Sequence, residues 1–224
     1  MLFSDDLETK PFELSTSTVN RLLGFCKTYS LAKKSCIVRI GDIPDTLYYI
    51  LEGSASVVVE DEDDMGHEII LAYLHPGDFI GEMGLFYSSR SRAAYVRTRT
   101  KTKLAKISYS RLNALFKNEL KEDEANILRA LGVQLTQRLI GTNRKVSQLA
   151  FMDVSGRIAR ALLDMCTAEE AVTHPDGTQL HISRQELARI VGCSREMAGR
   201  VLKNMAEQKM IGVNGMKIVV FHKR

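Results

Sequence analysis

The chain has 224 residues and a net charge of +4, and 45% of its residues are hydrophobic while 26% are charged. This composition is that of a globular protein with one or two domains, and it excludes a disordered or collagen-like chain. No apolar run approaches the ~18 residues of a membrane span and no secretory signal opens the chain, so we expect a cytoplasmic protein without membrane contact.

Residues 31–108 contain short runs of β-branched and aromatic residues separated by turns. The expected strands lie at 47–51, 55–59, 68–74 and 93–97. Turns at Gly41, Gly53, Gly66 and Gly77 recur every 11 to 13 residues, which is typical of an all-β roll or sandwich. The sequence therefore predicts a double-layered β-roll in the N-terminal half.

A long helix is predicted next, over about residues 123–150, where no proline occurs. One face carries side chains at spacings of three and four residues, a heptad-like seam of Leu128, Leu131, Leu135, Leu139, Thr142, Val146 and Leu149. Polar residues such as Gln134 and Gln137 lie off this seam. The helix could simply cover the roll, but the length of the seam favours a partner helix from a second copy, so we expect a homodimer. Phe151–Asp153 is the expected junction to a further helix at about 154–168.

Residues 183–209 carry the spacing of a helix-turn-helix. Ser183 and Glu186 form a capping box, Gly192 lets the chain turn out of the first helix, and Ser194 can cap the second. The inward positions are small or apolar at Ala188, Ala198 and Val201. Residues 125–224 contain 15 basic and 8 acidic residues, a net charge of +7, whereas residues 1–124 have a net charge of −3. DNA is therefore the expected partner, and the alternative is a pair of packed helices without a DNA role.

A hairpin is predicted after this motif. Residues 210–213 and 216–221 flank Asn214 and Gly215, and both of these residue types tolerate positive φ in a tight turn. A helix-turn-helix followed by a hairpin is a winged helix.

The second helix of the motif begins with charged side chains that suit base reading. Arg195 and Arg200 can donate two hydrogen bonds to guanine, and Glu196 can accept one from cytosine. A solvated face with internal Arg–Glu pairs is the alternative, and it can coexist with base reading in the free protein. The residues expected to contact DNA are Arg184, Ser194, Arg195, Glu196, Arg200 and Lys203, of which Arg184 and Lys203 are better placed for phosphates.

A candidate ligand site lies between Gly77 and Ala94. Gly81 and Gly84 can let backbone amides approach an anion, Glu82 can accept from a sugar hydroxyl, and Arg92 can bind a phosphate. Glycines alone are weak signals in a β-roll, but their combination with an arginine eight residues after Gly84 is specific.

With these motifs the sequence resembles the cyclic-AMP receptor protein (catabolite activator) family of bacterial transcription regulators. The resemblance covers nearly all the chain beyond about residue 25, through segments 46–50, 77–86, 149–154, 173–177 and 191–196. It implies an allosteric activator that holds cyclic AMP between the roll and the long helix and reads TGTGA-like half-sites. The ligand residues it implies are Gly81, Glu82, Met83, Gly84, Arg92, Ala93, Arg138, Thr142 and Asn143. The surface implied to contact RNA polymerase is Thr173, His174, Pro175, Asp176 and Gly177.

Two departures from the family pattern bear on the ligand. The family usually has a hydroxyl residue after the phosphate-binding arginine, where this chain has Ala93, and another after the adenine-binding threonine, where it has Asn143. Losing a hydrogen bond to a charged group would weaken ligand binding by about ten- to a hundredfold. A regulator that binds DNA without cyclic AMP, or responds to another nucleotide, is the alternative.

The predicted fold class is α+β, with three parts in chain order. Residues 1–124 form a double-stranded β-helix (jelly roll) that binds a cyclic nucleotide, 125–152 a dimerisation helix and hinge, and 153–224 a winged helix-turn-helix. A cupin-like metal enzyme would need converging ligands, but the roll offers only His67 and His75, and the four cysteines lack metal-site spacing. We therefore expect neither an enzyme nor a bound metal.

Overall fold

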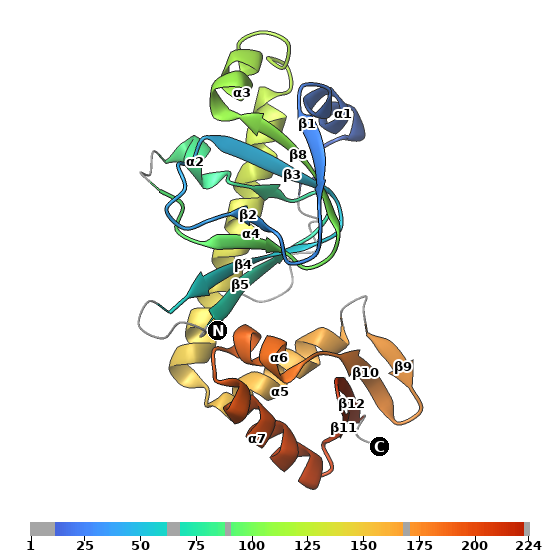
Figure 1. Ribbon diagram of the computed structural model, residues 1–224. Helices are drawn as coiled ribbons and strands as arrows, with labels where there is room; N and C mark the ends of the chain where they lie inside the picture. Colours follow the sequence, from blue (N-terminus) through green and yellow to red (C-terminus); the bar gives the residue numbers. More distant parts are fainter. Residues whose placement is uncertain (1–11, 62–67, 88–90, 168–170, 222–224) are drawn as a thin grey trace. The chain divides into compact units, whose positions relative to one another are not determined.

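The computed structural model describes residues 12–61, 68–87, 91–167 and 171–221 (Figure 1). The chain divides into two compact units, the first made of Met1–Val57 and Ala72–Gly141 and the second of Val58–Leu71 and Thr142–Arg224. The chain passes between them within β4 (Ala55–Glu60), β5 (Glu68–Leu74) and α4 (Glu124–Phe151). No helix in the described part of the chain is long and apolar enough to span a membrane.

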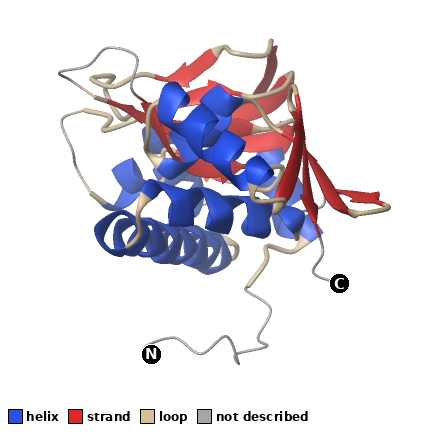
Figure 2. Ribbon diagram, turned by 90° about the horizontal axis from the view of Figure 1, so that it is seen from below, coloured by secondary structure: helices blue, strands red, loops and turns tan. Residues whose placement is uncertain are grey.

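Two four-stranded sheets, β1-β8-β3-β6 and β2-β7-β4-β5, form the β-roll, which confirms the predicted jelly roll (Figure 2). The strands not yet bounded are β1 (Lys27–Leu31), β2 (Cys36–Val38), β3 (Thr46–Glu52), β6 (Phe79–Ile80), β7 (Tyr95–Thr98) and β8 (Thr102–Ser108), and the helices of this unit are α1 (Thr16–Gly24), α2 (Met83–Phe86) and α3 (Tyr109–Phe116). The strand predicted at 93–97 begins two residues later, at Tyr95.

Apolar side chains from both sheets fill the inside of the roll. Ile50 and Leu104 are fully buried there and lie opposite each other in the antiparallel pair β3–β8. The turn after β3 requires glycine, because Gly53 has φ +85° and a Cβ at this position would lie 2.3 Å from the carbonyl oxygen of Lys101. This turn carries the chain from β3 in one sheet to β4 in the other.

The long helix α4 has two different surfaces along its length. In its N-terminal half Ile127 and Leu131 are fully buried with residues of α1 and α3. In its C-terminal half Leu139 and Val146 are 61% and 58% exposed. The helix is therefore confirmed, and only the later part of the predicted seam is left uncovered in the single chain.

Gln134, which lies off the predicted seam, is nevertheless part of the buried face of α4. Its side chain is only 8% exposed and forms two hydrogen bonds with the backbone of Phe79 in β6. An amide side chain is tolerated there because it satisfies both the backbone N–H and the backbone carbonyl of Phe79.

The second unit contains a winged helix-turn-helix, as predicted. Its elements are α5 (Val154–Cys166), β9 (Val172–His174), β10 (Gly177–His181), α6 (Arg184–Val191), α7 (Arg195–Glu207), β11 (Ile211–Asn214) and β12 (Lys217–Phe221). The strands form one sheet in the order β11-β12-β10-β9, which is larger than the predicted hairpin. The hairpin turn is shifted by one residue, because Asn214 pairs with Lys217 and the two turn residues are Gly215 and Met216. Gly215 has φ +62°, whereas Asn214 is extended strand.

Local signals explain the geometry of α6 and α7. The hydroxyls of Ser183 and Ser194 accept the amide hydrogens of Glu186 and Met197, and Gly192 ends α6 in the left-handed conformation at φ +68°. Arg157 of α5 donates to the carbonyl oxygens of Val191 at 2.9 Å and Gly192 at 3.2 Å. These two hydrogen bonds fix the turn between α6 and α7 to α5.

Residues 58–61 and 68–71 belong to this second unit. Glu68 forms an ion pair with Arg189 of α6, with 2.8 Å between Oε2 and Nη2. Lys145 of α4 donates to the carbonyl oxygen of Ile70, and burial lowers the pKa of this lysine. The start of β5 is thus part of the unit that contains the helix-turn-helix.

Candidate functional site

The β-roll contains a cavity of about 290 Å³. Its wall is formed by strands of the roll, by the loop and short helix 81–87, by residues 91–94, and by Arg138 of α4. Seven of the nine predicted ligand residues line it: Gly81, Glu82, Met83, Gly84, Arg92, Ala93 and Arg138. The structure therefore brings together residues that lie up to 57 positions apart in the sequence.

Arg92 lies in this wall with its guanidinium held by backbone. Its Nη2 donates to the carbonyl oxygen of Thr46 at 2.7 Å and its Nη1 to that of Gly81 at 3.2 Å. The guanidinium also lies 5.9 Å from the centre of the Tyr109 ring. Arginine has five N–H donors, so these two bonds orient the group and leave donors for an anion.

The two predicted glycines have different roles. Gly81 has φ +93°, and a Cβ there would lie 2.7 Å from the Thr46 carbonyl and 2.8 Å from Nη1 of Arg92, so only glycine lets the arginine reach this position. At Gly84 a Cβ would lie 2.5 Å from the hydroxyl of Tyr109. Gly84 therefore makes room for a tyrosine, a role that differs from the predicted approach of its amide to an anion.

Tyr109 is a cavity-supporting residue that sequence reasoning missed. Its hydroxyl donates to the carbonyl oxygen of Gly81, the same oxygen that Arg92 contacts. Burial raises the pKa of Tyr109, while the nearby Arg92 lowers it. The hydroxyl is protonated at neutral pH and remains a donor, which fixes the Gly81 carbonyl. The sequence around Tyr109 has no motif that would have revealed this contact.

Glu82 and Arg138 form a partly buried ion pair in the wall of the cavity. Glu82 is 2% exposed, and its Oε1 lies 2.5 Å from Nη1 of Arg138. Nη2 of Arg138 donates to the carbonyl oxygen of Phe79 at 2.7 Å, close to the bonds of Gln134. The carboxylate that was expected to accept from a sugar hydroxyl is therefore already neutralised by an arginine of α4.

Thr142 and Asn143 do not line the cavity of this chain. They are exposed and lie one helical turn beyond Arg138 on α4. Ala93 does line it and brings no hydroxyl to the site.

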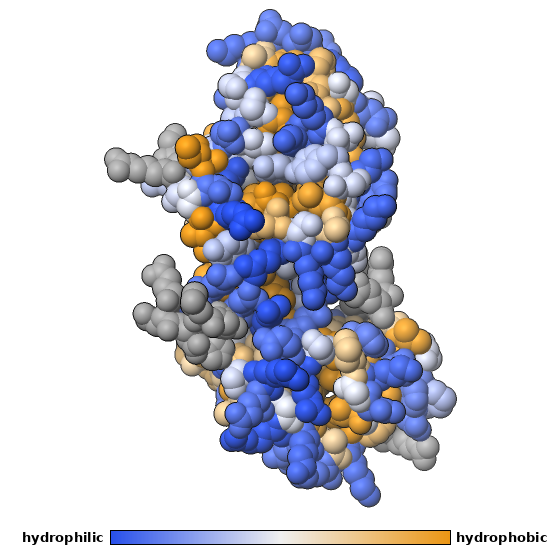
Figure 3. Space-filling model, in the orientation of Figure 1, coloured by the Kyte–Doolittle hydropathy of each residue, from blue (hydrophilic) through white to orange (hydrophobic). Residues whose placement is uncertain are grey.

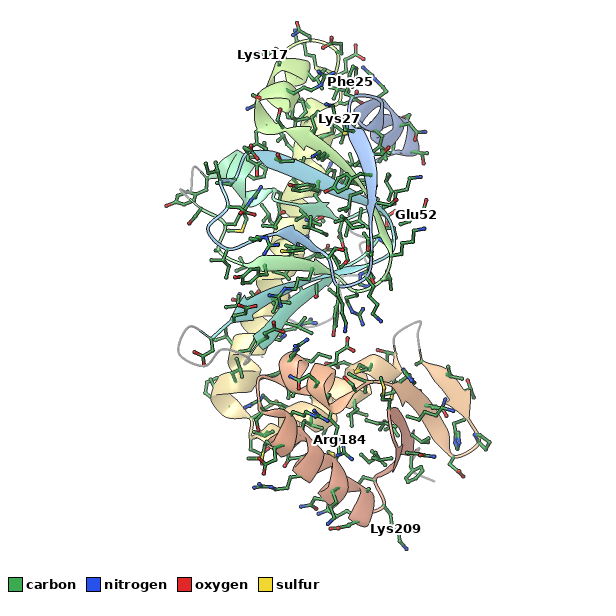
Figure 4. All side chains as sticks on the ribbon, in the orientation of Figure 1. Phe25, Lys27, Glu52, Lys117, Arg184 and Lys209 are labelled. Carbon is green, nitrogen blue, oxygen red and sulfur yellow. The ribbon has the colours of Figure 1, made fainter. Side chains whose placement is uncertain are left out.

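The second candidate site is a groove across the helix-turn-helix. It is lined by Arg184, Arg195, Glu196, Gly199, Arg200 and Lys203, which include five of the six predicted DNA-contacting residues. Arg184, labelled in Figure 4, extends from the start of α6 across Gly199 of α7, whose Cβ position lies 3.5 Å from Cδ of Arg184. The sixth residue, Ser194, caps α7. The surface over α7 is largely hydrophilic (Figure 3).

The alternative of a charged face with internal pairs is also present in the free chain. Nη2 of Arg200 lies 3.0 Å from Oε1 of Glu196, and both side chains are exposed. An exposed pair of this kind is worth little, so it does not oppose base contacts by either residue.

The segment Thr173–Gly177 forms the end of the β9–β10 hairpin. His174 pairs with Gly177, and Pro175 and Asp176 make an exposed turn between them. Gly177 is buried, and the position requires glycine because a Cβ there would clash with the carbonyl oxygen of Val220 in β12.

Comparisons with known proteins identify both domains. A family profile for the cyclic nucleotide-binding domain matches residues 29–119, and one for the Crp-like helix-turn-helix domain matches residues 156–223. The CRP-like protein Clp of Xanthomonas euvesicatoria pv. vesicatoria is 46% identical over 216 residues, which cover 96% of this chain and 93% of the relative.

Solved structures show the same architecture. One is described as the c-di-GMP responsive global regulator CLP of Xanthomonas campestris, with 46% identity, a TM-score of 0.89, and coverage of 93% of this chain and 100% of that one. A CRP/FNR-family transcriptional regulator from Thermus thermophilus has 26% identity and a TM-score of 0.68, over 88% of this chain and 94% of that one. This protein therefore belongs to the CRP family of DNA-binding transcription regulators, which are not enzymes.

Proposed function

We propose that this regulator binds a cyclic nucleotide in the β-roll cavity and that the ligand changes its affinity for DNA. The observation that carries the proposal is Arg92, which is oriented by two backbone carbonyls in the wall of the cavity and retains N–H donors for a phosphate. The chemistry shared by all candidates is an anionic cyclic phosphodiester.

Cyclic di-GMP is the first candidate. A relative of 46% identity over nearly the whole chain is described as c-di-GMP responsive. One feature of the site also weakens the case for cyclic AMP, because Ala93 supplies no hydroxyl.

Cyclic AMP, the ligand predicted from the resemblance, is the second candidate. The cavity of about 290 Å³ is at the lower end of the ~300–1,000 Å³ that small-molecule sites occupy, and it suits one nucleotide better than two. Thr142 and Asn143 would then meet the adenine only if a second copy of the chain completed the site.

The DNA proposal follows from the groove over α7. Arg195, Glu196 and Arg200 would read the bases of TGTGA-like half-sites, and Arg184 and Lys203 would contact phosphates. Two copies joined along the exposed C-terminal half of α4 would place two recognition helices about one DNA turn, roughly 34 Å, apart. The turn at Thr173–Gly177 is proposed to contact RNA polymerase, because it is exposed and carries distinct polar residues.

The proposal is tested by fluorescence anisotropy of a labelled duplex with two TGTGA half-sites, at one fixed salt concentration. A nucleotide that acts through the roll should change the DNA affinity by about 5- to 150-fold. Arg92→Leu should abolish the response, whereas Arg39→Leu, an exposed arginine outside the cavity lining, should retain it. DNA binding that is the same with cyclic di-GMP, with cyclic AMP and without nucleotide would show a ligand-independent regulator.

A further inference from the structure

Exposed apolar side chains lie at the mouth of the roll cavity. Met83 and Tyr87 both line the cavity, yet they are 61% and 72% exposed. The amide of Tyr87 donates to the carbonyl oxygen of Met83 at 2.9 Å, so the two residues are tied together at one edge. A single exposed apolar residue needs no explanation, but an aromatic ring at the mouth of a ligand cavity is suited to contact what emerges from it.

The volume of the cavity limits how much of a dinucleotide it can hold. A cavity of about 290 Å³ is small for a ligand site, whereas cyclic di-GMP contains two complete nucleotides joined in one ring. If one phosphate meets Arg92 inside, the second nucleotide must stand outside the mouth. Its guanine would then be exposed to water unless a residue of the rim covered it.

We propose that Tyr87, with Met83 beside it, is a stacking platform for the second purine base of a cyclic dinucleotide. This inference rests on the proposed function, in which the first nucleotide is held through Arg92. An aromatic ring binds the face of any base without reading its edge, so Tyr87 contributes affinity for a dinucleotide and none for a mononucleotide that stays inside. The rim therefore distinguishes ligands by their size.

The test uses the full chain and exploits its lack of tryptophan. Tyr87→Trp places a single tryptophan at the rim, where it can be excited selectively. Phe86→Trp, at a position 52% exposed and outside the cavity lining, is the matched control. Cyclic di-GMP should quench the Tyr87→Trp emission in a saturable way and leave the Phe86→Trp emission nearly unchanged. Cyclic GMP should quench neither variant.

Affinities measured by calorimetry provide the second readout. Tyr87→Ala should weaken cyclic di-GMP by about ten- to a hundredfold and leave cyclic GMP within about twofold of the unaltered protein, while Tyr87→Phe should restore dinucleotide binding. Since Tyr87 is exposed, the variants should retain the thermal unfolding midpoint of the parent protein.

The outcomes separate the two proposals. If cyclic di-GMP binds with full dependence on Arg92 but is indifferent to Tyr87→Ala, the platform is wrong and the proposed function stands. If Tyr87→Ala weakens cyclic di-GMP and cyclic GMP equally, Tyr87 supports the cavity itself and the platform is again wrong. If no cyclic nucleotide binds the parent protein, the proposed function fails and the platform fails with it.

Discussion

Replacing Gln134 with leucine should destabilise the β-roll by about 1–3 kcal/mol. The side chain is buried, its Oε1 accepts from the amide of Phe79 at 2.7 Å, and its Nε2 donates to the carbonyl of Phe79 at 3.0 Å. Arg138 donates to the same carbonyl, so the carbonyl keeps a partner in Gln134→Leu. The amide loses its partner, and a buried unsatisfied group costs about 1–3 kcal/mol.

Urea unfolding followed by circular dichroism measures this loss, with Gln137→Leu as the control. Gln137 lies three residues further along α4 and is exposed, so its replacement should change the stability by less than about 0.5 kcal/mol. The double variant Gln134→Leu/Arg138→Leu removes both donors to the Phe79 carbonyl and should cost more than the sum of the single changes. A loss below about 0.5 kcal/mol in Gln134→Leu would refute the reasoning, since it would mean that water satisfies the Phe79 amide.

The remaining predictions concern DNA reading, a turn and a thiol. Arg195→Ala should lower discrimination between a TGTGA palindrome and single-base variants by about 1–3 kcal/mol, whereas Lys203→Ala should weaken binding to all sequences alike. A uniform loss of affinity in both variants would show that Arg195 does not read bases. Gly53→Ala should destabilise the roll by at least about 2–4 kcal/mol in urea unfolding, because its Cβ would lie 2.3 Å from a backbone oxygen and φ is +85°; a cost under about 1 kcal/mol would show that the turn shifts freely. Burial raises the pKa of Cys26 from 9.0 to about 11. Pulse alkylation at pH 8, read by mass spectrometry, should therefore label Cys26 roughly a hundredfold more slowly than a thiol of pKa 9.0, because only the thiolate reacts. Equal labelling rates would show that Cys26 is exposed.

Features encoded by neighbouring residues could be predicted from the sequence. The caps Ser183 and Ser194, the left-handed Gly192 and the small inward residue Ala188 each act within one or two helical turns. Their spacing therefore specifies the helix-turn-helix without knowledge of distant contacts. The cavity residues from Gly81 to Arg92 are also close in sequence, and the structure places them in the wall of one cavity.

Features that depend on distant contacts could not be predicted in this way. Gln134 is polar and lies off the seam of α4, so periodicity does not reveal that it is buried, and its partner Phe79 is 55 positions away. The role of Tyr109 depends on Gly81 and Gly84, which lie on another element. The shifted wing turn has a similar origin, because the register of β12 is also fixed by its pairing with β10.

The predicted domain boundaries at residues 124 and 152 divide the chain into continuous stretches. In the structure, by contrast, the chain passes between the two units within β4, β5 and α4. Each of these crossings lies inside a helix or strand rather than in a linker. Each unit consists of two separate segments of the chain. A fragment that begins at residue 142 would lack the carboxylate that pairs with Arg189 and the carbonyl that receives Lys145. Such a fragment should expose both cations to solvent and be less stable than the same residues in the whole chain. Proteolysis after residue 141 would accordingly leave the first unit complete in one piece and divide the second unit between the two pieces.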